Sequence, residues 1–112
     1  MVSLQAAIVA LALSSGGEMV LLDFNAPWCG PCRQMKPVVQ QLASAGYPIK
    51  EINVDTERPL ADQYGVSGIP CFVLLVDGQE VDRVEGVASA DRLVHMFDKA
   101  RGLAPPVVQP AG

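Results

Sequence analysis

The sequence predicts an α/β fold with three layers, in which a central mixed sheet of about four strands lies between helices on both faces. Apolar segments of strand length alternate with segments of helical periodicity, in the order helix, strand, helix, strand, helix, strand, strand, helix. The two adjacent strands are separated by Asp77-Gly78, a strong hairpin signal, so an antiparallel pair joins an otherwise strand–helix–strand chain. The chain has 112 residues, which is enough for one domain with one core.

The first predicted helix, residues 4–13, is apolar on two opposite faces. Such a helix is buried, or it contacts a second partner, which here would be a neighbouring domain or the second subunit of a weak dimer. The run is too short to cross a bilayer, which takes about 20 apolar residues. A signal-peptide core is the alternative, although the positively charged start of such a signal is absent. We therefore expect a monomer without membrane attachment.

The next two predicted elements are a central strand and a long helix. Residues 19–24 are apolar except for Asp23, which is the pattern of a strand in the middle of a sheet. The helix is expected over 31–44, because Pro31 suits the first turn of a helix and Gly46 is placed to end it.

The second half of the chain supplies a strand, a short helix, an apolar strand, a more polar edge strand and a last helix. They are expected at residues 49–54, 56–64, 71–76, 81–85 and 89–101. Gly65 is the predicted stop of the short helix, and Ser89 is the predicted N-cap of the last one. Residues 1–103 are assigned to the domain, and residues 104–112, which are rich in proline, to a flexible tail.

Composition and charge exclude several classes of protein. Half of the residues are hydrophobic and 18% are charged, which is typical of a globular chain rather than a disordered one. The net charge is -4, and acids and bases are mixed along the chain without a basic run. Nucleic acid is therefore not an expected partner.

Two of the three cysteines, Cys29 and Cys32, form a close pair, and Cys71 stands alone. The pair is a working redox pair, half of a metal site or a structural staple. A staple would close so small a loop that it constrains little chain entropy. A zinc site takes four ligands, and the remaining candidates are Cys71 and His95, which is expected on the last helix. We therefore expect no metal.

Redox chemistry suits the place of the pair in the predicted fold. Cys29 follows a strand and precedes a helix, where unpaired N–H groups and the positive end of the helix dipole favour the thiolate. That thiolate would attack a substrate disulfide, and Cys32 would then attack Cys29 to release the reduced substrate. Asp23 is the candidate acceptor for the proton of Cys32, because burial would raise its pKa.

From about residue 4 to residue 102 the sequence resembles the thioredoxin family. The matching residues are Asp23-Phe24, Ala26, Trp28-Cys29-Gly30-Pro31-Cys32, Pro37, Asn53-Val54-Asp55, Gly65, Gly68-Ile69-Pro70, Asp77-Gly78 and Gly86. Two cysteines separated by two residues are weak support for a family. The run W-C-G-P-C at a strand–helix junction, followed by G-I-P, is much more specific.

The resemblance implies a thioredoxin-like three-layer sandwich and a thiol–disulfide oxidoreductase that reduces protein disulfides. It would need no cofactor beyond its own Cys29–Cys32 pair. Cys29 would be the exposed nucleophile, Cys32 the resolving thiol and Asp23 the buried proton acceptor. A thioredoxin-reductase-like electron donor would recycle the pair. Gly30-Pro31 is the reducing type of sequence within the family, which favours the cytoplasm.

The resemblance also implies a surface that binds the substrate. Trp28 would cover the site, beside Gly30 and Pro31. The Ile69–Pro70 peptide bond would be cis and would face the cysteines, and the backbone beside it would bind an extended substrate as an added strand. Gly86 would line the same groove.

The sequence departs from the family in four places. The usual first edge strand is missing, and Asn25 stands where an aromatic residue is common. Glu51 falls where the family often has a lysine, so a second carboxylate would raise the pKa of Asp23. Cys71 follows the predicted cis-proline, where threonine is common. Its simplest interpretation is a small buried strand residue, and a thiol that modulates the site is the alternative.

Two other functions remain open at this point. The apolar first helix and the proline-rich tail also suit a domain of a longer envelope or membrane-attached protein that transfers electrons, with a periplasmic location. A non-catalytic binding module with the same fold is the other alternative, although it would have no use for an intact cysteine pair.

Overall fold

The computed structural model describes residues 18–102. Its helices and strands are β1 (Met19–Asn25), α2 (Gly30–Ser44), β2 (Ile49–Asn53), α3 (Arg58–Gln63), β3 (Cys71–Val76), β4 (Gln79–Glu85) and α4 (Ala90–Gly102). The predicted first helix, the predicted absence of an edge strand before it and the predicted tail all concern residues outside the described range.

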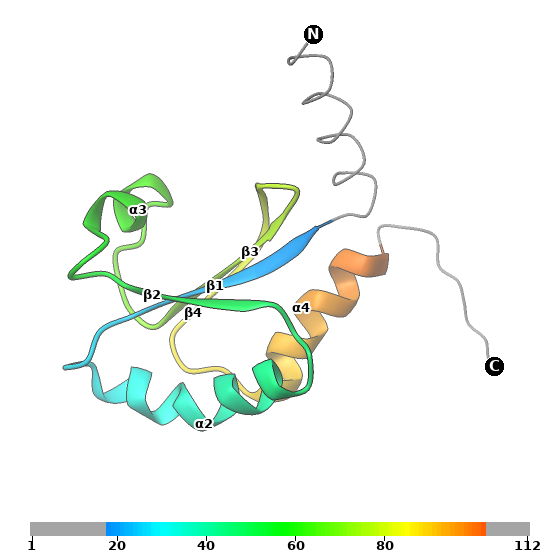
Figure 1. The fold of residues 1–112 in the computed structure, drawn as a ribbon, viewed down its shortest axis with the longest axis horizontal. Coiled ribbons are helices and arrows are strands. Elements are labelled where there is room, and N and C mark those ends of the chain that lie inside the picture. Colours follow the sequence, from blue (N-terminus) through cyan, green and yellow to red (C-terminus); the bar gives the residue numbers. More distant parts are fainter. Residues whose placement is uncertain (1–17, 103–112) are drawn as a thin grey trace, which may run out of the picture.

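The four strands form one mixed sheet in the order β2-β1-β3-β4. Strands β1 and β2 are parallel, whereas β1 with β3 and β3 with β4 are antiparallel. Helices α2 and α4 cover one face, and α3 lies on the other (Figure 1). The predicted α/β sandwich with helices on both faces is thereby confirmed.

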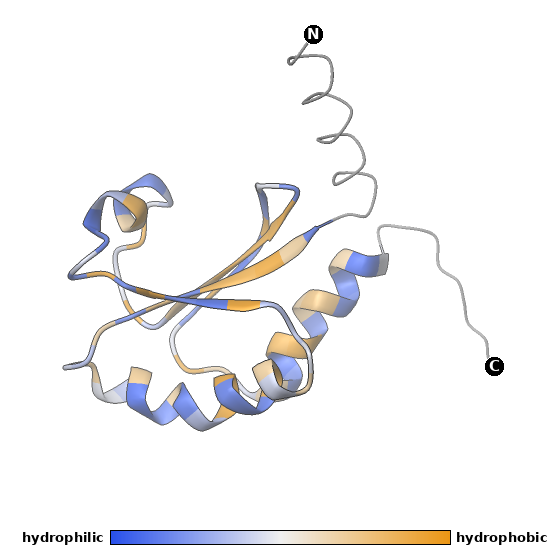
Figure 2. Ribbon diagram, in the orientation of Figure 1, coloured by the Kyte–Doolittle hydropathy of each residue, from blue (hydrophilic) through white to orange (hydrophobic). Residues whose placement is uncertain are grey.

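The central strands β1 and β3 are buried on both faces, because successive strand residues point to opposite sides of the sheet. On the side of α2 and α4 the core contains Leu21, Val39, Phe72, Leu74, Leu93 and Phe97. On the side of α3 it contains Leu22, Phe24, Ile52, Ala61, Val73 and both paired cysteines. Figure 2 shows hydrophobic residues along the central strands and polar residues along the outer sides of the helices. Burial of each large apolar side chain contributes about 1.5–3 kcal/mol, so these two clusters hold the layers together.

Helix α2 ends as the sequence predicts. Gly46 has a φ of +100°, which favours glycine, and its N–H group donates a hydrogen bond to the carbonyl of Ala43. The N–H group of Tyr47 donates to the carbonyl of Leu42. These two bonds make up the Schellman motif, which satisfies carbonyls that the last turn leaves unpaired.

Helix α3 is shorter than the predicted segment 56–64. The N–H groups of Thr56 and Glu57 both donate to the carbonyl of Asn53, so a turn occupies the residues before Arg58. At the other end Gly65, with a φ of +62°, stops the helix as predicted. The N–H groups of Gly65 and the next residue make the same pair of bonds as those that end α2.

The hairpin between β3 and β4 follows the predicted turn. Asp77 and Gly78 both have positive φ, +53° and +83°, as the tight turn of a two-residue hairpin requires. Strand β4 starts at Gln79, earlier than the predicted residue 81. It contains a bulge, because Leu74 pairs with Asp82 and Leu75 with Glu80, which leaves one additional residue in β4.

Helix α4 begins after the predicted N-cap. The Oγ atom of Ser89 accepts a hydrogen bond of 3.0 Å from the N–H group of Arg92, which satisfies one free donor of the first turn. Within residues 18–102, no helix has both the length and the hydrophobicity that crossing a membrane requires.

Candidate active site

The two paired cysteines form a disulfide at the start of α2, with their Cα atoms 5.2 Å apart. Cys29 is the N-cap of the helix, and its Sγ atom accepts a hydrogen bond of 3.1 Å from the N–H group of Cys32. The predicted position of Cys29 at the helix N-terminus is confirmed. There the free N–H groups and the helix dipole favour negative charge on sulfur.

The expectation that Cys29 is exposed is wrong for this disulfide form. The exposed fraction of Cys29 is 4%, and that of Cys32 is 8%. The physical reason is local, because the Sγ atom of Cys29 lies between the N–H group of Cys32 and the carbonyl oxygen of Ile69, 3.9 Å away. In the disulfide form the side chain of Cys29 is therefore largely covered rather than projecting into solvent.

The loop before β3 brings a main-chain acceptor to the disulfide. The Ile69–Pro70 peptide bond is cis, as predicted. The carbonyl oxygen of Pro70 accepts a hydrogen bond of 2.8 Å from the N–H group of Gly86, which has a φ of +90°. The structure therefore places Ile69, Pro70 and Gly86 together, although they are far apart in the sequence.

Trp28 projects from the surface, with 65% of its area exposed. Its indole Nε1–H donates a hydrogen bond of 2.8 Å to Oδ2 of Asp55. With Ile69 and Arg58, Trp28 lines a pocket of about 140 Å³ beside the disulfide. The side chain is therefore not part of the core, and the hydrogen bond fixes the ring next to the loop.

Sequence reasoning gave no role to two residues that shape this region. Asp55 holds the Trp28 ring, and Arg33 donates a hydrogen bond of 2.9 Å to the carbonyl of Pro27. Asp55 stands in the matched run N-V-D, which was the available signal. Arg33 has no comparable signal, because its partner is a main-chain carbonyl that only the fold brings within reach.

Asp23 is buried in β1, with 4% of its area exposed, and Glu51 lies opposite it on the parallel strand β2. The predicted register is confirmed. Burial first, and then the charge of Glu51, raise the pKa of Asp23 from 3.8 to about 6. The amide of Asn25 and the charge of Lys36 lower this pKa in part. Asn25 Nδ2 also lies 3.5 Å from Oε1 of Glu51.

A groove of about 850 Å³ joins these groups, and we call it the α2 groove. Its lining includes Asp23, Asn25, Cys32, Lys36, Gln40 and Glu51. Cys32 and Asp23 therefore face a common open space. Water in such a space can exchange protons with both groups.

Cys71 lies directly after Pro70 in β3 and is fully buried. It belongs to the same apolar cluster as Cys29 and Cys32. Burial raises the pKa of its thiol, although the nearby Arg83 lowers it in part. Within the described residues, His, Cys, Asp and Glu side chains do not gather in groups that could hold a metal ion.

Comparison with known proteins agrees with this geometry. The family model for thioredoxin matches residues 3–99. The thioredoxin of Chlamydia caviae is 42% identical over 72% of this chain and 81% of its own length. Thioredoxin 1 of Synechococcus elongatus is also 42% identical, over 71% of this chain and 78% of its own.

Solved structures are similar as well. A mutant thioredoxin from Halobacterium salinarum is 39% identical, with a TM-score of 0.73 over 84% of both chains. The thioredoxin of Fasciola hepatica is 34% identical, with a TM-score of 0.69 over 85% of this chain and 93% of its own. This chain therefore belongs to the thioredoxin family, and it is a thiol–disulfide oxidoreductase with Cys29–Cys32 as its active-site disulfide.

Proposed function

We propose that the reduced chain donates two electrons to disulfides of other proteins in the cytoplasm, and that a thioredoxin-reductase-like enzyme restores the dithiol. One observation carries this proposal. The sulfur of Cys29 lies at a helix N-terminus and 3.9 Å from the carbonyl oxygen of Ile69, so a nucleophile and a main-chain acceptor for a substrate lie side by side. Thioredoxins as a family reduce protein disulfides and are themselves reduced by thioredoxin reductase.

Cys29 is the proposed nucleophile and Cys32 the resolving thiol. The Cys29 thiolate attacks one sulfur of the substrate, the substrate S–S bond breaks, and the other sulfur leaves as a thiolate. Cys32 then attacks the sulfur of Cys29. The Cys29–Cys32 bond forms, the mixed disulfide breaks, and the second substrate sulfur leaves. The N–H group of Cys32 supports negative charge on Cys29 in the first step.

Asp23 is the proposed acceptor for the proton of Cys32. Both residues line the α2 groove, which gives the proton a route through water. An acceptor works best when its pKa is near the working pH, and the pKa of Asp23 is about 6. Glu51 is the proposed modulating residue, because its charge is one cause of that raised pKa. For Cys71, full burial favours a packing role over the modulating one.

The proposed substrate surface consists of Trp28, Gly30, Pro31, Ile69, Pro70 and Gly86. The carbonyl of Ile69 would accept a hydrogen bond from an N–H group of an extended substrate chain, which is recognition by strand addition. The exposed Trp28 ring would pack against the same chain. The hydrogen bond from Gly86 to Pro70 holds the loop that presents the carbonyl.

Three cysteine variants test the roles proposed for Cys29 and Cys32. With insulin as the protein disulfide, Cys32→Ser should stop at a covalent complex that mass spectrometry detects and that dithiothreitol removes. Cys29→Ser should form no complex and reduce no substrate. Cys71→Ser is the matched control and should reduce insulin at the rate of the natural chain. Reduction by Cys29→Ser would contradict the assignment of the nucleophile.

The reduction potential tests the proposed compartment. Trp28 is the only tryptophan in the chain and lies next to the pair, so its fluorescence can follow the redox state in thiol–disulfide buffers. A potential near the known thioredoxin value of about -270 mV would support a cytoplasmic reductant. A potential of about -180 mV or above would instead favour a protein of the periplasm or envelope.

A further inference from the structure

The bulge in β4 changes which side chains share a face of the sheet. In a regular strand, residues three apart point to opposite faces. Here Glu80 pairs with Leu75 and Arg83 pairs with Val73, and Val81 is the additional residue between them. Leu75 and Val73 both belong to the core on the α3 side, so Glu80 and Arg83 also point to that side. The bulge therefore allows these two side chains to meet.

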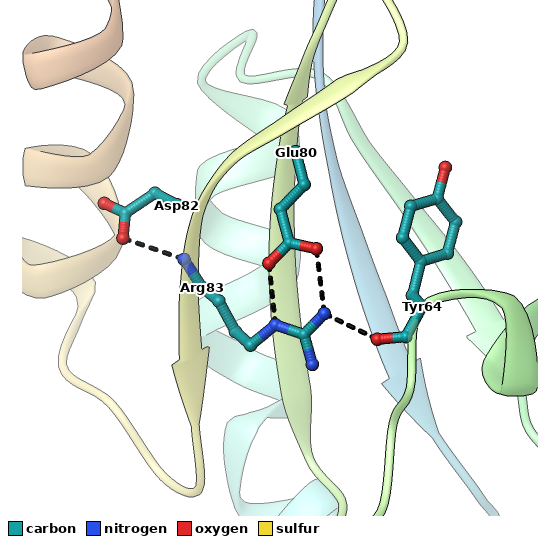
Figure 3. A network of polar contacts seen from close by, with 4 residues as sticks. All are labelled: Tyr64, Glu80, Asp82 and Arg83. Carbon is teal, nitrogen blue, oxygen red and sulfur yellow. Dashed lines mark hydrogen bonds and ion pairs between the residues drawn. The ribbon is translucent and has the colours of Figure 1, made fainter.

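The guanidinium group of Arg83 makes three hydrogen bonds on this face (Figure 3). Its Nε and Nη2 atoms donate to the two carboxylate oxygens of Glu80, at 2.7 and 2.8 Å. Nη2 also donates to the carbonyl oxygen of Tyr64. A quarter of the Arg83 side chain is exposed, so solvent screens these charges only in part. The carboxylate thus orients the arginine toward the end of α3.

Tyr64 is the C-cap of α3 and the last residue before the loop 65–70. Its carbonyl is among those that the end of a helix leaves without a partner in the helix. Here the carbonyl accepts a hydrogen bond from Arg83. At the other end of the loop, the N–H group of Gly86 donates to the carbonyl of Pro70. Strand β4 and Gly86, the residue directly after it, therefore hold the two ends of the loop. The carbonyl of Ile69, which faces Cys29, lies between the two anchors.

We propose that Arg83 is a positioning residue for the reduction of protein disulfides: its bond to Tyr64 fixes the loop 65–70 so that the Ile69 carbonyl stays beside the disulfide. This inference rests on the proposed role of Ile69 in binding the substrate chain. None of the hydrogen bonds of Arg83 within the described residues reaches the disulfide, so its effect passes through the loop.

The geometry calls for arginine rather than for any cation. The planar fork of a guanidinium can bind both carboxylate oxygens and still donate to a carbonyl, whereas the ammonium of lysine is a compact point charge. Arg83→Lys should therefore still hold the loop 65–70 in part, and Arg83→Gln should lose most of this hold. Glu80→Gln leaves the arginine in place but weakens its orientation, which provides a variant with an unchanged Arg83 if Arg83→Gln folds poorly.

Hydrogen exchange tests the contact itself. The amides of Gly65 and Val66 close the end of α3, and those of Gly46 and Tyr47 make the same main-chain bonds at the end of α2. Among the described residues Arg83 donates to the capping carbonyl of Tyr64, whereas Arg101 contacts the ring of Tyr47 and not a capping carbonyl. Arg83→Gln should speed exchange at the first pair about threefold to tenfold and leave the second pair unchanged. Arg101→Gln is the matched control for exchange at Gly65 and Val66, because it breaks an arginine–carboxylate pair of the same spacing on α4. The comparison is confined to these two amides, since Arg101 also lies over the ring of Tyr47. Equal exchange at Gly65 in Arg83→Gln and in the natural chain would overturn the proposal.

Single-turnover kinetics test the consequence, with Trp28 fluorescence as the signal. Arg83→Gln should react with insulin about threefold to tenfold more slowly. Its reaction with hydroxyethyl disulfide, which is too small to need the loop, should be unchanged, and Arg83→Lys should restore part of the insulin rate. Equal slowing with both disulfides would overturn the proposal, because it would indicate general damage to the site.

The two measurements also separate the inference from the proposed function. Faster loop exchange with an unchanged insulin rate would overturn the inference and would show that the loop does not bind the substrate, which is a failure of the role proposed for Ile69. Unchanged loop exchange would overturn only the role of Arg83.

Discussion

Asp23 and Glu51 lie opposite each other on the parallel strands β1 and β2, and both face the α2 groove with Cys32. A buried carboxylate thus has a second carboxylate as its neighbour in the sheet. Burial and this neighbour both favour the protonated form of Asp23, so its pKa is about 6 in the folded chain instead of 3.8. We therefore expect the free energy of unfolding and the rate of disulfide reduction to depend on pH through Asp23.

Asp23→Asn should stabilise the protein above pH 7. The pKa of Asp23 is raised on folding. Its contribution to the free energy of unfolding is therefore most favourable below pH 3.8, and this stabilisation is lost as the pH rises through about 6. The gap between the two values corresponds to about 3 kcal/mol. Urea unfolding should therefore show Asp23→Asn up to about 3 kcal/mol more stable at pH 8, with little difference at pH 4. The same difference at both pH values would contradict a raised pKa in the folded state.

Glu51→Gln should lower the pKa of Asp23, because it removes the second cause of its increase. The change is observable as a shift of the Asp23 carboxyl titration toward 3.8 in carbon-detected NMR. The low-pH limb of the insulin reduction rate should move in the same direction if Asp23 accepts the proton of Cys32. Glu18→Gln removes an equal charge directly before β1, at the end of the strand away from the cysteines, and is the control. A shift of the titration without a shift of the rate would separate Asp23 from the proton transfer.

Most of the fold could be predicted, because local patterns determine it. The apolar segments of β1 and β3 have strand length, Asp77-Gly78 supports a tight turn, and Gly46 and Gly65 stand where helices end. The start of α3 was predicted too early, because the N–H groups of Thr56 and Glu57 donate to the carbonyl of Asn53 and form a turn before the helix. Such competition between a turn and a helix depends on backbone geometry that the sequence does not display.

Those parts of the site that a sequence motif carries could also be predicted. A motif indicates the cysteine pair and the cis-proline, and the resemblance to the thioredoxin family places Glu51 near Asp23, a register that the structure confirms. The contacts of Arg83 were not predictable, because a residue three positions from Glu80 should point to the opposite face. Only the bulge at Val81 reverses this, and bulges have weak sequence signals.

Cys71 should be inert toward alkylation in the folded protein. It is fully buried, and burial raises the pKa of its thiol, so little reactive thiolate is present at neutral pH. The reduced native chain should therefore take up iodoacetamide at Cys29 and Cys32 only, as peptide mass spectrometry can show. In urea all three cysteines should react. Rapid labelling of Cys71 in the native chain would revive a modulating role for this thiol.

Trp28→Ala should impair the function far more than the stability. The ring is 65% exposed, so its removal forfeits little buried apolar area, and the unfolding free energy should change by less than about 1 kcal/mol. The rate of insulin reduction should fall about tenfold if the ring packs against the substrate chain, because an aromatic contact at the centre of an interface contributes about 1–2 kcal/mol. Trp28→Phe keeps an aromatic face but loses the hydrogen bond to Asp55, so it should have an intermediate rate. Asp55→Asn removes the charge of the acceptor while leaving the ring intact, and it should reduce insulin faster than Trp28→Ala. An insulin rate for Trp28→Ala equal to that of the natural chain would remove Trp28 from the substrate surface.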